Sequence, residues 1–167
     1  INLTTKTDAK ETIVMKAPTG SGKTIILIDY IDTYLSNVDK KTAFIWLCPG
    51  KGNLEEQSRE KMIKLSPGRS TQNLFDALLG GFAEESTTFI NWELVTKSGN
   101  IAIRDSERKN LFDRIAEAHR KGTEFIVIID EEHSNNTVKA KSIIDAFAAK
   151  HIIRVSATAI ENKRFEF

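Results

Sequence analysis

The sequence of 167 residues has little of several features that mark particular classes of protein. It holds one cysteine, Cys48, which excludes an internal disulfide and a cysteine-rich zinc site. Its apolar runs, such as Ile25–Ile28 and Phe125–Ile129, are far shorter than the roughly 20 residues that a membrane-spanning helix needs. No basic segment followed by an apolar one opens the chain. We therefore expect a cytoplasmic protein without a signal peptide and without a membrane partner.

An excess of charge of either sign is also missing. The 24 lysines and arginines nearly balance 23 aspartates and glutamates, which leaves a net charge of +1. Bulk charge thus gives no support to nucleic-acid binding, which has to be argued from local features. The length suits one well-buried domain. The first residue is Ile1 and not Met, so we expect residues 1–167 to be a single domain from a larger protein.

Short apolar runs alternate along the chain with amphipathic segments. The expected strands are Thr12–Lys16, Thr42–Cys48, Thr87–Trp92, Glu124–Asp130 and Ile152–Val155. The expected helices are Lys23–Asn37, 54–65 with Asn53 as its cap, Thr71–Leu79, Ser106–Arg120 and Thr137–Ala149. Strands separated by helices require right-handed crossovers and a parallel sheet covered on both faces. The pattern predicts a three-layer α/β fold with a mostly parallel sheet of at least five strands, in which ligands bind at the carboxyl ends of the strands.

A glycine-rich segment, Ala17-Pro-Thr-Gly-Ser-Gly-Lys-Thr24, follows the first expected strand and opens a helix. This is the context of a phosphate loop, in which backbone N–H groups and the helix N-terminus surround the phosphates of a nucleotide. Ala17 stands where the pattern usually begins with glycine. Lys23 would reach the β- and γ-phosphates of ATP, and the Thr24 hydroxyl would bind Mg²⁺. The predicted nucleotide-binding residues of this P-loop NTPase are Pro18, Thr19, Gly20, Ser21, Gly22, Lys23 and Thr24.

A buried strand ends in the acidic cluster Asp130-Glu131-Glu132-His133. Three adjacent carboxylates are costly unless a cation is present, and Mg²⁺–ATP supplies one. Asp130 would hold Mg²⁺ through its water shell, and Glu131 would position and deprotonate the attacking water. No cysteine or histidine at metal-binding spacing accompanies His133, which we interpret as a hydrogen-bonding relay and not a zinc ligand. The predicted catalytic residues are Lys23, Asp130 and Glu131, and the predicted Mg²⁺ ligands are Thr24 and Asp130.

The segment Ser156-Ala-Thr158 closes the last expected strand, so its two hydroxyls should lie beside the acidic cluster. Small hydroxyl residues at a strand end are most often turn formers. In this order and spacing, however, APTGSGKT, DEEH and SAT resemble motifs I, II and III of the superfamily 2 helicases of the DExH group, in their first RecA-like lobe. The resemblance implies that His133, Ser156 and Thr158 couple ATP hydrolysis to movement.

Two further segments are less specific. Pro49-Gly-Lys-Gly-Asn-Leu-Glu-Glu-Gln57 is similar to motif Ia of that family, although it is one residue longer than the commonest form. Together with Phe89-Ile-Asn-Trp-Glu93, it resembles most closely the ATPase part of the type III restriction enzyme Res subunit. The resemblance implies contacts with nucleic-acid backbone at Pro49, Gly50, Lys51, Gln57, Asn91 and Trp92.

The resemblance also implies an ATP-dependent DNA helicase or translocase. Its expected partners are duplex DNA, a second RecA-like lobe in the same parent chain and a modification (methyltransferase) subunit. The second lobe would supply an arginine finger, so we expect the lobe alone to hydrolyse ATP very slowly. No glutamine precedes the phosphate loop to recognise adenine, which leaves base preference open. Alternatives are an RNA-acting DExH helicase and a switch or assembly ATPase that does not bind nucleic acid. A degenerate, structural P-loop domain is disfavoured by the intact catalytic residues.

Overall fold

The structure, a computed structural model, describes residues 10–18, 20–38, 41–50, 52–96, 110–131 and 138–157. The strands are β1 Glu11–Lys16, β2 Thr42–Cys48, β3 Ser70–Asn73, β4 Ser86–Asn91, β5 Glu124–Asp130 and β6 His151–Ser156. The helices are α1 Lys23–Asn37, α2 Leu54–Leu65, α3 Leu74–Gly80, α4 Trp92–Thr96, α5 Leu111–Arg120 and α6 Val138–Phe147. No helix among these residues is long and apolar enough to cross a membrane.

The strands form one sheet in the order β1-β6-β5-β2-β4-β3, and every neighbouring pair is parallel. All carboxyl ends therefore lie along one side of the sheet, which we call the carboxyl edge. The predicted α/β fold is confirmed, with a sixth strand beyond the five that we expected. The phosphate loop follows β1, the outer strand at one end of this order, and the acidic cluster follows β5, two strands further in.

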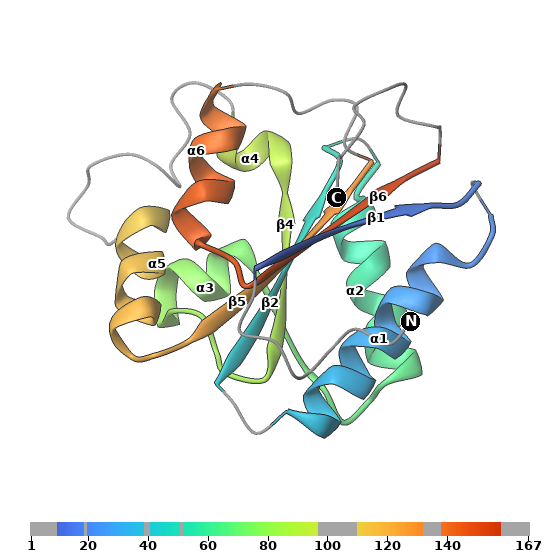
Figure 1. The fold of residues 1–167 in the computed structure, drawn as a ribbon, viewed down its shortest axis with the longest axis horizontal. Coiled ribbons are helices and arrows are strands. Elements are labelled where there is room, and N and C mark those ends of the chain that lie inside the picture. The colour runs from blue at the N-terminus through green and yellow to red at the C-terminus, as the bar shows by residue number, and fades with distance from the viewer. Residues whose placement is uncertain are drawn as a thin grey trace.

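Helices cover both faces of the sheet (Figure 1). Helices α1 and α2 pack on one face, and α3, α4, α5 and α6 pack on the other. The two central strands, β2 and β5, are buried on both faces, so their side chains point alternately into two separate cores. This explains why both strands are apolar almost throughout, as strands inside a parallel sheet are.

One expected helix is partly wrong. In place of a helix over Thr71–Leu79, the chain forms strand β3, paired with β4, and then helix α3. The strand sequence Ser-Thr-Gln-Asn lacks the apolar residues by which we identified the other strands. The Gln72 side chain holds this edge in place, because its oxygen accepts the Ala83 N–H at 2.9 Å and its nitrogen donates to the Gly81 carbonyl at 3.1 Å.

Two predicted helix caps differ from the structure, although α2 begins at Leu54 as expected. Asn53 precedes α2, but it has a left-handed φ of 53° and its side chain caps no N–H group. Helix α5 begins at Leu111, where Asn110 and Asp113 bond reciprocally to each other's backbone N–H in a capping box. The predicted cap at Ser106 lies outside the described residues.

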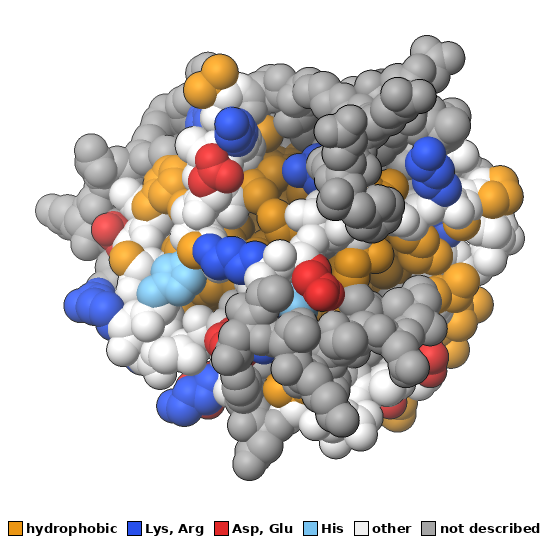
Figure 2. Space-filling model, in the orientation of Figure 1, with side chains coloured by type: hydrophobic (Ala, Val, Ile, Leu, Met, Phe, Trp, Pro, Cys, Tyr) orange, Lys and Arg blue, Asp and Glu red, His pale blue; other side chains and the backbone are white. Residues whose placement is uncertain are grey.

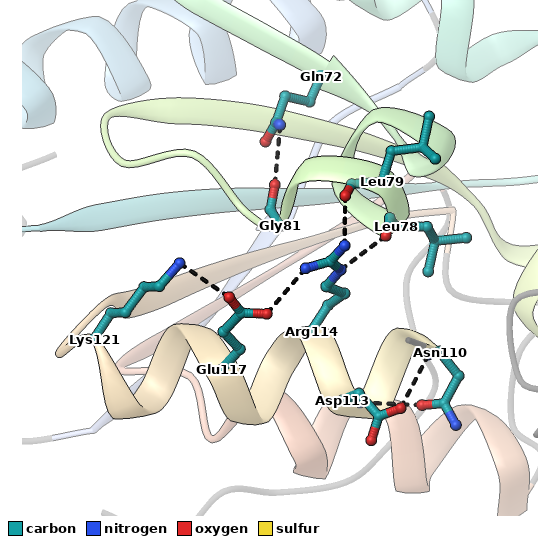
Figure 3. A network of polar contacts seen from close by, with 9 residues as sticks. All are labelled: Gln72, Leu78, Leu79, Gly81, Asn110, Asp113, Arg114, Glu117 and Lys121. Carbon is teal, nitrogen blue, oxygen red and sulfur yellow. Dashed lines mark hydrogen bonds and ion pairs between the residues drawn. The ribbon is translucent and has the colours of Figure 1, made fainter. Parts of the chain in front are cut away.

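Helix α5 is attached to α3 through one arginine (Figure 3). Arg114 donates from Nε to the Leu78 carbonyl at 2.8 Å and from Nη2 to the Leu79 carbonyl. Its Nη1 pairs with Glu117 at 3.0 Å, and Glu117 also binds Lys121 at 3.1 Å. The last carbonyls of a helix have no partner within the helix. Arg114 therefore satisfies the end of α3 with a side chain from α5.

Candidate nucleotide-binding site

The phosphate loop connects the end of β1 to the start of α1. The Ala17 N–H donates to the Ser156 carbonyl at 3.2 Å, which fixes the start of the loop against β6. Gly20 and Gly22 have φ values of 82° and 81°, in the left-handed region that favours glycine. The glycines of the loop thus occupy positions where side chains would be strained. Thr19 lies outside the described residues.

An ion pair joins the phosphate loop to the acidic cluster. Lys23 Nζ lies 2.9 Å from Glu131 Oε1, across 108 positions of sequence. The Lys23 side chain is only 12% exposed, so its ammonium group is held inside the site and does not extend into solvent. The amino end of α1 and the carboxyl end of β5 therefore meet at one point of the carboxyl edge.

Glu131 has an uncommon backbone conformation. Its φ of 51° places a non-glycine residue in the left-handed region, where strain of about 1–3 kcal/mol is usual. Its N–H donates to the Val155 carbonyl at 2.9 Å, which anchors the turn to β6. The chain thus turns directly after β5, in the conformation that brings the Glu131 carboxylate to Lys23. Residues held in this way occur most often at functional sites.

The Asp130 carboxyl group is largely buried at the end of β5. Burial raises the pKa of Asp130, and the neighbouring Glu131 charge raises it further. Lys23, the Trp46 indole and the Glu131 backbone N–H oppose this rise in the pKa. A bound cation would relieve the cost of charging a buried carboxyl group, so the position suits a metal ligand.

The donor set fits Mg²⁺ bound together with a nucleotide. Thr24 follows Lys23 in the first turn of α1, and Asp130 precedes Glu131 at the end of β5. In the described ranges, no three histidine, cysteine or acidic side chains gather into a metal site of their own. Mg²⁺ is usually bound by one or two protein oxygens, with substrate phosphates and water completing its shell. The assignments of Thr24 and Asp130 as ligands remain predictions.

The predicted coupling residues are only partly described. Ser156 is buried at the end of β6, beside Lys16 in the register of the sheet, and its carbonyl accepts the N–H of the phosphate loop. His133 and Thr158 lie outside the described residues. The structure thus brings Ser156 to the start of the phosphate loop, while the coupling role of all three residues remains a prediction.

The predicted nucleic-acid contacts fall at the carboxyl ends of β2 and β4. Pro49 and Gly50 follow β2 and are partly exposed, and Asn91 ends β4, where its side chain donates to Glu55 at 3.3 Å. Gln57 is exposed on α2 and donates to the Gly52 carbonyl at 2.9 Å. Lys51 lies outside the described residues. The prediction for Trp92 is wrong, because this side chain is 1% exposed and packs in the core under α4.

The charged side chains that line this part of the carboxyl edge are the carboxylates of Glu55 and Glu56. A hollow of about 150 Å³ is lined by Glu55, Glu56, Asn73, Leu74, Phe75, Phe89, Asn91 and Leu94. Gly50 lies so close to Glu93 that a Cβ on the glycine would be 1.9 Å from Glu93 Cγ. No lysine or arginine lines this hollow, so phosphate contacts by the described side chains around it would be few. On the molecular face in Figure 2, which views the molecule from the side of β1, basic and acidic side chains are interspersed and form no broad basic field.

Sequence reasoning missed two features of the site. The Lys23–Glu131 ion pair depends on strand order and on a left-handed turn, and the sequence signals neither of them. Trp46 lies within β2, near Asp130, and we interpreted it only as part of an apolar strand. The available signal was a tryptophan, whose indole N–H can donate a hydrogen bond, within a largely apolar strand. Another hollow, of about 260 Å³, lies away from the site, around Lys10, Glu124 and Lys150.

Comparison with known proteins identifies the family. The family model for the type III restriction enzyme, res subunit, matches residues 2–161, nearly the whole chain. The chain belongs to this family. The resemblance that we based on the motifs is thereby confirmed at the level of the Res family and of a RecA-like helicase lobe. No curated protein matches the sequence.

A solved structure shows the same fold. The Sulfolobus solfataricus SWI2/SNF2 ATPase core, determined in complex with double-stranded DNA, superposes with a TM-score of 0.63 at 15% sequence identity. The match covers 90% of this Res-family chain but only 28% of the SWI2/SNF2 chain. The similarity supports the RecA-like architecture, and the Res-family chain corresponds to a part of that larger ATPase core.

Proposed function

We propose that this chain is the ATP-binding motor lobe of a cytoplasmic, ATP-dependent DNA translocase, the Res subunit of a type III restriction enzyme. Membership of the Res family supports ATP-dependent motor activity. The observation that carries the proposal is the approach of Lys23 Nζ to Glu131 Oε1, at 2.9 Å. A phosphate-loop lysine and an acidic residue after β5 are therefore in direct contact, next to the amino end of α1 where, in this proposal, the γ-phosphate binds.

In this proposal Lys23 exchanges its carboxylate partner for phosphate oxygens when ATP binds. Glu131 is then free to orient a water molecule and to accept its proton. Mg²⁺, held by Thr24 and Asp130, would neutralise charge on the β- and γ-phosphates. The backbone N–H groups of residues 18–24 would bind the phosphates at the amino end of α1.

The proposed nucleic-acid partner is duplex DNA, as in the SWI2/SNF2 complex. Contacts would come from the segment 49–51, Gln57 and Asn91, chiefly through phosphates, which carry no sequence information. We also propose that a second RecA-like lobe and a modification (methyltransferase) subunit act with this lobe. The carboxylates near Asn91 make the lobe alone a weak DNA-binding module.

Two variants of the 167-residue chain test the nucleotide site. Lys23→Ala removes the side-chain cation aimed at the phosphates, and a charge-assisted hydrogen bond of this kind contributes about 1.5–3 kcal/mol. Titration calorimetry with ATP and Mg²⁺ should show a loss of affinity of about tenfold or more. Glu131→Gln should keep or improve ATP affinity, because it frees Lys23 from its partner, and it should abolish turnover in the parent protein.

Equal ATP affinity in wild type and Lys23→Ala would contradict the phosphate-loop assignment. If Glu131→Gln lowered affinity and turnover together, Glu131 would be a structural or metal-binding residue and not a base. Lys61→Ala is a matched control, since Lys61 is an exposed lysine on α2 whose loss should change neither measurement.

A further inference from the structure

Trp46 is a buried side chain with an unpartnered donor. It lies in the middle of β2, is 0% exposed, and its indole Nε1 has no hydrogen-bond partner. Its ring stacks on Phe89 of β4, with centroids 5.3 Å apart and planes 27° apart. An unsatisfied buried donor costs about 1–3 kcal/mol, and such groups are few in native proteins. Packing alone does not explain this N–H, because a phenylalanine in the same stack would avoid the cost.

The register of the sheet places this donor beside the metal-binding carboxyl group. Trp46 pairs with Ile128 on β5, so the next residue of β5 on the same face is Asp130. Two residues along a strand span about 6.6 Å, a distance that an indole ring can cover. The Trp46 N–H also acts on the Asp130 carboxyl group and lowers its pKa, although the two groups do not reach the geometry of a full hydrogen bond. The Trp46 N–H and the Asp130 carboxyl group are therefore close neighbours without a full hydrogen bond between them.

Other donors near Asp130 are already occupied. The Glu131 backbone N–H, which also acts on Asp130, donates to the Val155 carbonyl at 2.9 Å. Lys23 is paired with Glu131. Of the three groups that favour the charged form of Asp130, only the Trp46 N–H has no acceptor of its own.

We propose that the Trp46 indole is a positioning residue for the Asp130 carboxylate, and that its N–H donates to this carboxylate when Mg²⁺ and nucleotide bind. The inference rests on the proposed function, because it assigns Asp130 to the metal. A carboxylate ligand has two equivalent oxygens, and a donor that holds one of them directs the other towards the cation. Partners of metal ligands act in this way, and their loss typically weakens metal affinity 10- to 100-fold.

The chain contains two tryptophans, which provides a matched pair of variants. Trp46→Phe removes the N–H and keeps an aromatic ring against Phe89. Trp92→Phe makes the same chemical change at an equally buried residue on the opposite face of the sheet. Affinity for ATP is measured by calorimetry over a series of Mg²⁺ concentrations and in EDTA, together with urea unfolding of each protein.

Trp46→Phe should raise the Mg²⁺ concentration for half-maximal ATP binding about 10- to 100-fold and leave binding in EDTA unchanged. Trp92→Phe should change neither the Mg²⁺ concentration for half-maximal ATP binding nor the binding in EDTA. Wild-type Mg²⁺ dependence in Trp46→Phe would overturn the inference, as would an equal loss of binding with and without Mg²⁺. If the wild-type chain binds no ATP, the proposed function itself fails. If the wild-type chain binds ATP and Trp46→Phe shows the same Mg²⁺ dependence, the Trp46 inference alone fails.

Fluorescence gives a second reading that does not depend on the stability of Trp46→Phe. In Trp92→Phe the only indole is Trp46, so its emission should change when Mg²⁺ is added to the ATP-bound protein. The change should disappear in the double variant Trp92→Phe/Asp130→Asn. An emission unaffected by Mg²⁺, or a change that persists without the Asp130 carboxylate, would overturn the inference.

Discussion

Asp130 has a proposed role in metal binding, but its charged carboxylate lowers the stability of the protein without ligand. Its pKa is raised in the folded protein, first by burial and then by Glu131. A carboxyl group with a raised folded-state pKa favours the folded state while it is protonated. That contribution is complete below the unfolded pKa of about 3.9 and is lost as pH rises through the folded pKa. At neutral pH the charged Asp130 therefore destabilises the protein without ligand.

Asp130→Asn should accordingly raise the free energy of unfolding at about pH 8, and the gain should shrink towards about pH 4. Urea unfolding across this pH range, without nucleotide or Mg²⁺, measures it. Asp145→Asn is the control, because Asp145 is an exposed carboxylate on α6 and its loss should change stability little at any pH. A destabilised Asp130→Asn at pH 8 would contradict the burial cost. The same variant should lose the stabilisation by Mg²⁺–ATP.

At the residue scale, the sequence indicated candidate site residues but not their contacts. Lys23, Thr24, Asp130 and Glu131 could be proposed as site residues because a phosphate loop and an acidic strand end each have a local signature. Trp92 could not be placed correctly, since a tryptophan directly after a strand can point into the core or out to a ligand. Its burial is decided by α4, a short helix that starts at this residue.

Among the helices, the contact between α3 and α5 depends on Arg114. Its side chain is 14% exposed and binds the Leu78 and Leu79 carbonyls (Figure 3). Arg114→Ala should lower the free energy of unfolding by about 2–3 kcal/mol, because it removes two hydrogen bonds from a charged donor and leaves the end of α3 unsatisfied. Urea unfolding at pH 7 measures the change.

Arg120→Ala is the matched control for this prediction. Arg120 is an exposed arginine in the last turn of the same helix, and its interaction with the helix dipole contributes at most about 1 kcal/mol. Equal losses in the two variants would show that the Arg114 contacts with α3 contribute nothing specific.

The accuracy of the predicted elements follows from what each element buries. Strands β2 and β5 were clear because burial on both faces demands unbroken apolar sequence. Strand β3 was missed because an edge strand of four polar residues has no hydrophobic pattern and is held by its ladder and by Gln72. The type of residue before a helix does not decide whether its side chain caps the helix. Asn53 and Asn110 are equally good caps by type, but only Asn110 forms a capping box.

For the whole molecule, the sequence predicted a parallel sheet but not the order of its strands. Crossover connections fix the direction and handedness of neighbouring strands, whereas strand order depends on long-range packing. The placement of β6 between β1 and β5 is therefore a result of the structure. This order brings the ends of β1, β5 and β6 together, so it also assembles the candidate site.

The 167-residue chain should bind ATP and hydrolyse it very slowly. An arginine finger contributes about 10³–10⁵ in rate in P-loop enzymes, and we propose that a second lobe supplies it. Arg154 is a poor substitute because it lies within β6, between Val14 and Ile129 in the register of the sheet. A phosphate-release assay should find slow, DNA-independent turnover for this chain and faster, DNA-stimulated turnover for the longer parent protein. Equal rates would favour a self-contained ATPase.

The outer position of β1 has a consequence for how the protein is made. In the described part of the chain, β1 bonds only to β6, and the paired residues Glu11 and His151 are 140 positions apart (151 − 11). Contacts between such distant segments form slowly, because a long loop must close before they add stability. On the ribosome the phosphate loop would emerge before β6 and would lack this neighbouring strand until β6 was synthesised. ATP should therefore bind only a chain whose sheet is complete, and by binding it should protect that finished state from unfolding.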